Sequence, residues 1–118
     1  MSKRKIDSDF LINKISELIR TCSTDLPNDV YSSIKNCLNK TNNDKEKKIL
    51  SIILENADIA KNKKIALCQD TGMSIFFIEM GQNLEIEGEI KDIKQIINEA
   101  VKIVYSEKKL RPSILSDP

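Results

Sequence analysis

The spacing of apolar residues changes twice along this 118-residue chain, and these changes limit the folds open to it. Before residue 62, apolar residues recur at steps of three and four, a period typical of helices. From Met73 the pattern becomes a short β-branched and aromatic run over residues 74–80, followed by alternation over residues 84–88. Both patterns favour strands. From residue 90 the steps of three and four return, so the sequence predicts helices first, then a small sheet, then a covering helix.

Four helices are predicted from the apolar stripes, over about residues 9–22, 27–39, 44–61 and 90–107. Asp7 or Ser8 is expected to cap the first, and Pro27 suits the first turn of the second, where its missing N–H would be unbonded anyway. The third is apolar around much of its circumference, so we expect it to be largely buried. In the last, the stripe predicts core packing rather than a coiled coil, because the heptads are too few.

The β element is predicted as a hairpin. Residues 74–80 fit a strand buried on both faces, Gly81-Gln82-Asn83 is typical of a turn, and residues 84–88 alternate between apolar and acidic as a strand with one exposed face does. The predicted fold class is α+β in a single domain over residues 1–118. It consists of a helix-rich amino-terminal segment, a small β element after residue 72 and a covering helix.

Composition and charge exclude several classes of function. With 19 Lys and Arg against 18 Asp and Glu, the net charge of +1 argues against a highly basic nucleic-acid binder. The basic cluster Lys3-Arg4-Lys5 is expected to be a solubilising tail. The longest apolar runs are too short for a membrane span, and no secretory signal is predicted. Three irregularly spaced cysteines favour a reducing cytoplasm over a disulfide framework.

The chain contains no His, which excludes His-based triads and His-ligated zinc from these residues. The densest polar cluster between apolar segments is Cys68-Gln69-Asp70-Thr71-Gly72. Its thiol could ligate a metal or act as a nucleophile, its carboxyl could move a proton, and its glycine permits positive φ or a close approach to a ligand. An ordinary Asp-Thr-Gly turn is the alternative interpretation.

A second cluster is Leu110-Arg111-Pro112-Ser113, followed by Asp117-Pro118. The guanidinium of Arg111 matches a carboxylate bidentately, although a surface Arg beside a helix end is the alternative. Cys22 and Cys37 lie in apolar helical stripes, where buried structural thiols are the better interpretation.

Taken together, these motifs resemble the amino-terminal part of the alpha subunit or domain of iron–sulfur (class I) fumarases and the related L-tartrate dehydratases. The Cys-Gln-Asp-Thr-Gly element is highly specific for that family, and the resemblance runs in register through most of the chain. One departure is Ala66-Leu67, where the family usually has a Pro two residues before the Cys. The other matching elements are residues 26–30, Glu55-Asn56-Ala57 with Ala60, residues 110–113 and Asp117-Pro118.

The resemblance implies a hydro-lyase that reversibly hydrates fumarate to L-malate and carries a [4Fe–4S] cluster held by three Cys thiolates, with one iron open to substrate. By this match Cys68 is one of the three cluster ligands. Gln69 and Asp70 contact the substrate, with Asp70 the candidate acid that protonates the departing hydroxyl. Arg111 clamps a substrate carboxylate.

Family members continue well beyond this length, with two further cluster cysteines and a separate beta domain or subunit. Cys22 and Cys37 do not fall on those later motifs and are not expected to bind iron. We therefore expect an amino-terminal fragment or a split polypeptide, inactive alone, whose partners are the remaining alpha segment, the beta part and a small dicarboxylate substrate. A tartrate dehydratase component and a non-catalytic helical interaction module remain open as alternatives.

Overall fold

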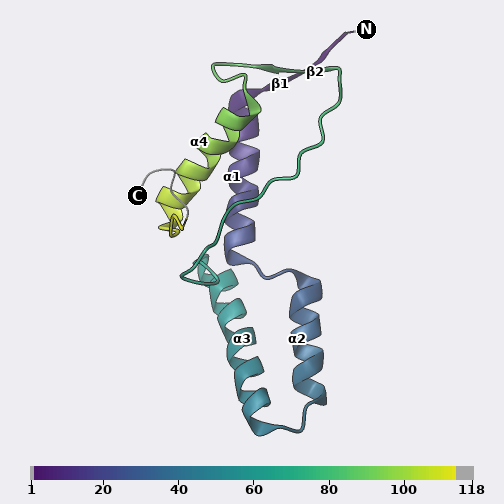
Figure 1. Cartoon of the computed structure of the whole chain (residues 1–118), viewed down its shortest axis with the longest axis vertical. Coiled ribbons are helices and arrows are strands. Elements are labelled where there is room, and N and C mark those ends of the chain that lie inside the picture. The colour runs from purple at the N-terminus through teal and green to yellow at the C-terminus, as the bar shows by residue number, and fades with distance from the viewer. Residues whose placement is uncertain (1, 114–118) are drawn as a thin grey trace. The chain divides into compact units, whose positions relative to one another are not determined.

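The computed structural model describes residues 2–113 and contains, within them, four α-helices and two short strands (Figure 1). The predicted α+β class is confirmed. Two compact units make up the chain: unit 1 consists of the residues up to Arg20 and from Asp70 onward, and unit 2 of Thr21–Gln69. The elements are, in order, β1 (Arg4–Asp7), α1 (Ser8–Thr24), α2 (Asn28–Lys40), α3 (Asp44–Lys63), β2 (Leu84–Glu87) and α4 (Ile93–Lys108).

The sheet of unit 1 is a parallel pair formed by β1 and β2 (Figure 1). Ile6 lies opposite Ile86, and the Lys5 ammonium forms an ion pair with the Glu87 carboxylate. A parallel pair needs a long crossover, and the crossover here contains α1, α2 and α3. The expectation that Lys3-Arg4-Lys5 is only a solubilising tail is therefore wrong. Arg4 and Lys5 belong to β1, and the ammonium groups of Lys3 and Lys5 form ion pairs with Glu85 and Glu87 of β2.

The predicted hairpin is also wrong. Residues 84–87 do form a strand, but residues 74–80 have no regular secondary structure, and β2 pairs instead with the amino-terminal strand. Side chains in this extended segment are strongly exposed, Phe77 by 98% and Ile75 by 67%. An apolar run is stabilised as a buried strand only when neighbouring elements cover it. Within residues 2–113, these side chains lack such a cover.

The helices of unit 1 occupy the predicted positions but bury somewhat different faces. The Asp7 carboxylate accepts the N–H of Phe10 at 3.0 Å and so caps α1 as expected. The residues that α1 buries in unit 1 are Ser8, Ile12, Ser16 and Ile19, whereas Leu18 of the predicted stripe is 62% exposed. In α4 the fully buried residues are Ile96, Ala100 and Val104.

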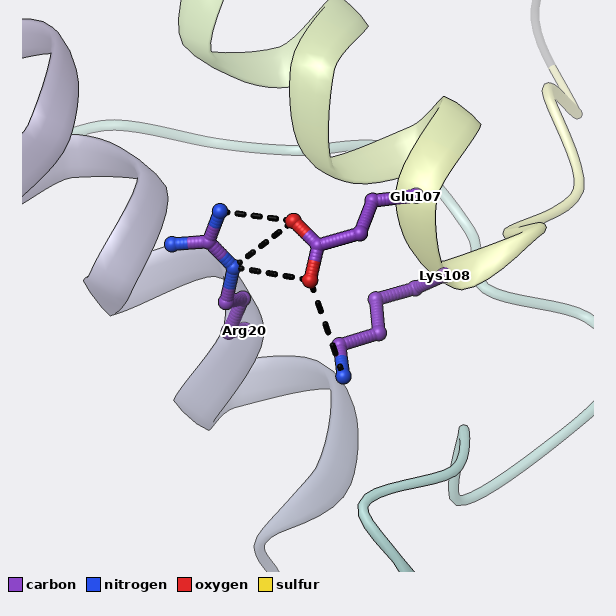
Figure 2. Close-up of polar contacts among 3 residues, drawn as sticks. All are labelled: Arg20, Glu107 and Lys108. Carbon is purple, nitrogen blue, oxygen red and sulfur yellow. Dashed lines mark hydrogen bonds and ion pairs between the residues drawn. The ribbon is translucent and has the colours of Figure 1, made fainter.

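An ion pair joins α1 to α4 in unit 1 (Figure 2). Arg20 donates from Nη2 to Glu107 Oε2 at 2.6 Å and from Nε to the same oxygen at 3.0 Å. These hydrogen bonds hold the pKa of Glu107 below its ordinary value. Because that pKa is depressed in the folded chain, the pair stabilises the fold at neutral pH, and its contribution is lost as the pH falls through the folded-state pKa.

Unit 2 is built on a helical hairpin in which α2 and α3 run side by side (Figure 1). The Asn43 side chain caps α3 by accepting the N–H groups of Lys45 and Glu46. The expectation that this helix is largely buried is wrong: it buries Leu54, Ala57 and Ala60, while Ile49, Ile52, Ile53 and Ile59 are exposed. A single neighbouring helix covers only one stripe of α3. Among residues 2–113, no helix is long and apolar enough to cross a membrane.

The close approach of Gly88 to Ser8 leaves no room for a side chain at this position of unit 1. The φ of Gly88 is +116°, and a Cβ atom at this position would lie 2.1 Å from the hydroxyl oxygen of buried Ser8. We expect Gly88→Ala to lower the free energy of unfolding by about 1–3 kcal/mol, from backbone strain and overpacking. Urea unfolding followed by circular dichroism measures this loss.

Gly81→Ala is the matched control, because open space surrounds Gly81 and its φ is not in the positive range. Equal unfolding midpoints for the two variants would contradict the close approach of Gly88 to the start of α1.

Candidate functional site

In unit 1, Asp70 and Thr71 of the first motif contact the segment 111–113 of the second. The Ser113 hydroxyl donates to Asp70 Oδ1 at 3.0 Å, across 43 residues of sequence. The Thr71 hydroxyl donates to the Arg111 carbonyl oxygen at 2.7 Å, across 40 residues. Two side chains with complementary charge are thereby gathered in one exposed part of the molecule, the Asp70 carboxylate and the Arg111 guanidinium.

The end of α4 positions the Arg111 side of this cluster. Lys109 takes the left-handed conformation with φ of 52°, and the N–H groups of Lys109 and Leu110 both donate to the Tyr105 carbonyl oxygen. This arrangement ends the helix as left-handed caps commonly do. Leu110 is then buried, at 5% exposure, and anchors the chain just before Arg111.

The other side of the cluster is the segment Asp70-Thr71-Gly72. Gly72 adopts φ of +65°, a conformation that glycine takes without the strain of a side chain. The Asp70 carboxylate accepts the Gly72 N–H at 3.4 Å, and Ser74 shares a hydrogen bond of 2.9 Å with the Tyr105 hydroxyl. The short-range contact of Asp70 with Gly72 is of the kind that an Asp-Thr-Gly turn makes, and the same segment carries the contacts to residues 111–113.

The Asp70 carboxyl is held in its ionised form by its surroundings. The hydrogen bond from Ser113 is the main cause of a pKa below the ordinary value of the group, and the Gly72 N–H and the positive charge of Arg111 act in the same direction. A hydrogen bond donated to the charged form of an acid stabilises that form. At neutral pH, the Asp70 carboxyl is therefore ionised.

Cys68 and Gln69 belong to unit 2, at its carboxyl end, and both are exposed. The residue before Cys68 is held through both of its backbone polar groups. The Leu67 N–H donates to the Ser23 carbonyl oxygen at 2.9 Å, and the Leu67 carbonyl accepts the Asn56 side-chain amide at 2.8 Å. Sequence reasoning gave Asn56 no role, although it named the Glu55-Asn56-Ala57 element to which this residue belongs.

All three cysteines are free and exposed. The expectation that Cys22 and Cys37 are buried structural thiols is therefore wrong. In α1 the buried face in unit 1 follows Ile12, Ser16 and Ile19, and Cys22 lies outside the buried set. In α2 no residue is buried at all, so its apolar stripe offers Cys37 no core.

The donor chemistry of this chain fits part of an iron–sulfur site. A Cys thiolate is the usual protein ligand of such clusters, and the exposed Cys68 thiol supplies one donor of this kind. Within the described part of the chain, no group of three or more Cys, Asp or Glu side chains is arranged to hold a metal ion. Of the ligands that such a cluster needs, the predicted site therefore offers one candidate, the Cys68 thiol.

An open cavity of about 420 Å³ lies on unit 2 at α2 and α3. Its lining includes Leu38, Leu54 and Asp58, and it contains none of the predicted site residues. The Asp117-Pro118 pair of the sequence analysis lies outside the described residues.

Comparison with known proteins identifies a family whose match includes both motifs, residues 68–72 and 110–113. The family described as "Fumarate hydratase (Fumerase)" matches residues 12–118. This chain belongs to that family.

Two relatives illustrate the match. One is "Putative L(+)-tartrate dehydratase subunit alpha" of Methanocaldococcus jannaschii, 36% identical over 101 residues, which are 86% of this chain and 35% of the relative. The other is L(+)-tartrate dehydratase subunit alpha of Escherichia coli K12, 30% identical over 94 residues, which are 75% of this chain and 31% of the relative. The chain spans about a third of the length of these relatives.

The contact between the two motifs makes a prediction about Asp70. Removing the Ser113 hydroxyl in Ser113→Ala takes away the main stabilisation of the ionised carboxyl, so the pKa of Asp70 is expected to rise toward its ordinary value. A carbon-detected NMR titration of the Asp70 carboxyl measures the shift. Ser106→Ala, at an exposed position of α4, is the control and should leave that pKa unchanged; a similar result from both variants would contradict the contact.

Proposed function

We propose that this chain forms part of a hydro-lyase that reversibly adds water across the double bond of a small dicarboxylate, converting fumarate to L-malate. The observation that carries the proposal is the contact of the Asp70 segment with the Arg111 segment. This contact brings a guanidinium that can bind a substrate carboxylate close to a carboxyl that can exchange a proton. Membership of the fumarate hydratase family supports the reaction class.

Arg111 and Gln69 are proposed to bind the substrate. The guanidinium fork of Arg111 is exposed and suits a bidentate grip on one substrate carboxylate. The Gln69 amide, two positions before Thr71, offers both a donor and an acceptor to substrate oxygens. These two roles leave the Asp70 carboxyl available for the proton.

Asp70 is proposed to move the proton at the hydroxyl oxygen, while a group from the remainder of the enzyme handles the proton at carbon. In the hydration direction Asp70 must accept a proton from the attacking water, and in the dehydration direction it must give one to the departing hydroxyl. The ionised carboxyl suits the first of these tasks, and the protonated carboxyl is the acid of the second.

Cys68 is proposed as one of the three thiolate ligands of a [4Fe–4S] cluster, the other two coming from the remainder of the enzyme. Such a cluster supplies an iron with an open position that acts as a Lewis acid toward the substrate. The exposed thiol and the held backbone before it support this role.

Further polypeptide is proposed to complete the enzyme: the remaining alpha segment, with which residues 1–118 form one domain, and a beta subunit or domain. The relatives are named alpha subunits and are about three times as long as the matched region. Exposed apolar side chains of the extended segment support contact with additional chain, namely Met73, Ile75, Phe77, Ile78 and Met80. The free cysteines support a reducing cytoplasm as the location. We expect the chain alone to show no hydratase activity.

Tartrate is the second candidate substrate, and the names of the two relatives favour it. Anaerobic assays of the complete enzyme with fumarate, L-malate and L-tartrate test both candidates. Turnover of fumarate supports the first proposal, turnover of L-tartrate alone moves the assignment to the second, and turnover of none indicates a non-catalytic interaction module.

Iron content tests the ligand assignment. In the complete enzyme reconstituted anaerobically, Cys68→Ser is expected to lose the cluster, because the hydroxyl is a poor replacement for a thiolate ligand. Cys22→Ser and Cys37→Ser also change exposed thiols and serve as matched controls that keep the cluster. Loss of iron from either control would show that the ligand set has been assigned wrongly.

Steady-state kinetics, normalised to iron content, test Asp70 and Arg111. Asp70→Asn keeps the shape of the side chain but cannot exchange the proton, so kcat should fall about 10²–10⁴-fold with normal iron content. Arg111→Lys keeps the charge but loses the bidentate fork, so it should mainly raise KM. A near-normal kcat per cluster for Asp70→Asn would remove Asp70 from the mechanism.

A further inference from the structure

We propose that Asn56 is a positioning residue that orients the backbone leading into Cys68. The inference rests on the proposed function, since it takes Cys68 as a ligand of the cluster. Asn56 lies in the second half of α3, and its Nδ2 donates to the carbonyl oxygen of Leu67 at 2.8 Å. This bond reaches from a helix to the residue immediately before the thiol.

Fixing this carbonyl fixes the peptide group that leads to Cys68. The peptide unit is planar, so a held Leu67 oxygen also sets the direction of the Cys68 N–H and the position of its Cα. The Leu67 N–H is held as well, by the Ser23 carbonyl oxygen at 2.9 Å. Two different helices, α3 through a side chain and α1 through its last turn, therefore determine where the backbone of Cys68 begins.

The path of the chain explains why Asn56 can reach this carbonyl. At the end of α3, Lys64 adopts the left-handed conformation with φ of 54°, and the Ile65 N–H returns to the Ala60 carbonyl oxygen at 3.1 Å. The Lys64 ammonium lies 3.5 Å from Asp25 Oδ1, which ties this turn to the segment after α1. Reversed in this way, the chain brings Leu67 level with Asn56, two turns before the end of the helix.

The residue type also suits the role. Asn is a weak helix former because its side chain competes for backbone groups, so an Asn in the interior of α3 contributes little to the helix itself. Here its amide donates to the backbone of another segment. In metal sites, groups that orient the ligands are commonly worth about 10–100-fold in metal affinity.

Amide hydrogen exchange on the 118-residue chain tests the positioning directly. Asn56→Leu keeps approximate size and removes the donor, and it should speed exchange of the Leu67 amide about 2- to 10-fold, the range expected for one net hydrogen bond. Asn62→Leu is the matched control, made at an exposed Asn of the same helix, and should leave that amide unchanged. An unchanged Leu67 amide in Asn56→Leu, or equal acceleration throughout α3, would overturn the inference.

Cluster retention in the complete enzyme provides the second measurement. After anaerobic reconstitution, the visible absorbance of the cluster should decay about 10-fold faster in Asn56→Leu than in wild type or Asn62→Leu. Equal decay in all three proteins overturns the role of Asn56 and leaves the proposed function standing. Failure of the wild-type protein to take up any cluster overturns the ligand role of Cys68, while the exchange experiment still decides whether Asn56 holds the backbone.

Discussion

Hydrogen bonds to the irregular segment between α3 and β2 are the interactions on which the candidate site depends. This segment forms no helix or strand, so a few hydrogen bonds to side chains in or near helices set its course. Asn56 binds Leu67, Ser113 binds Asp70 and Tyr105 binds Ser74. A motif in such a loop is held only where each bond is satisfied, since an exposed backbone otherwise samples many conformations.

The sequence predicted the helices well because their signals are local. The cap at Asp7, the start after Pro27 and the apolar stripe through Ala100 and Val104 depend on neighbours within a few residues. Burial could not be predicted in the same way, because it depends on which element lies opposite. Among residues 2–113, α2 and α3 each cover only one stripe of the other, and Ile49 and Cys37 lie outside those stripes.

The pairing of the strands was predicted wrongly, because it depends on residues far apart in the sequence. Residues 84–87 alternate as a strand should, but nothing local indicates that their partner is the terminal run Arg4–Asp7 rather than residues 74–80. The motifs around Asp70 and Arg111 were found from their residue types, and their meeting required the structure. Asn56 was marked in the sequence only as part of the Glu55-Asn56-Ala57 element, and its bond to Leu67 required the structure.

The parallel pairing of β1 with β2 has a consequence for the order in which the chain acquires structure during synthesis. β1 is made before unit 2 but must wait for Leu84 before it can pair, whereas unit 2 is continuous in sequence and relies on near neighbours. Strands that are distant in sequence pair slowly, because the entropy of loop closure is lost before their contacts stabilise the chain. On the ribosome, the helical hairpin of unit 2 is thus complete while β1 is still an unpaired edge, a window in which an unpaired strand is open to association with other chains.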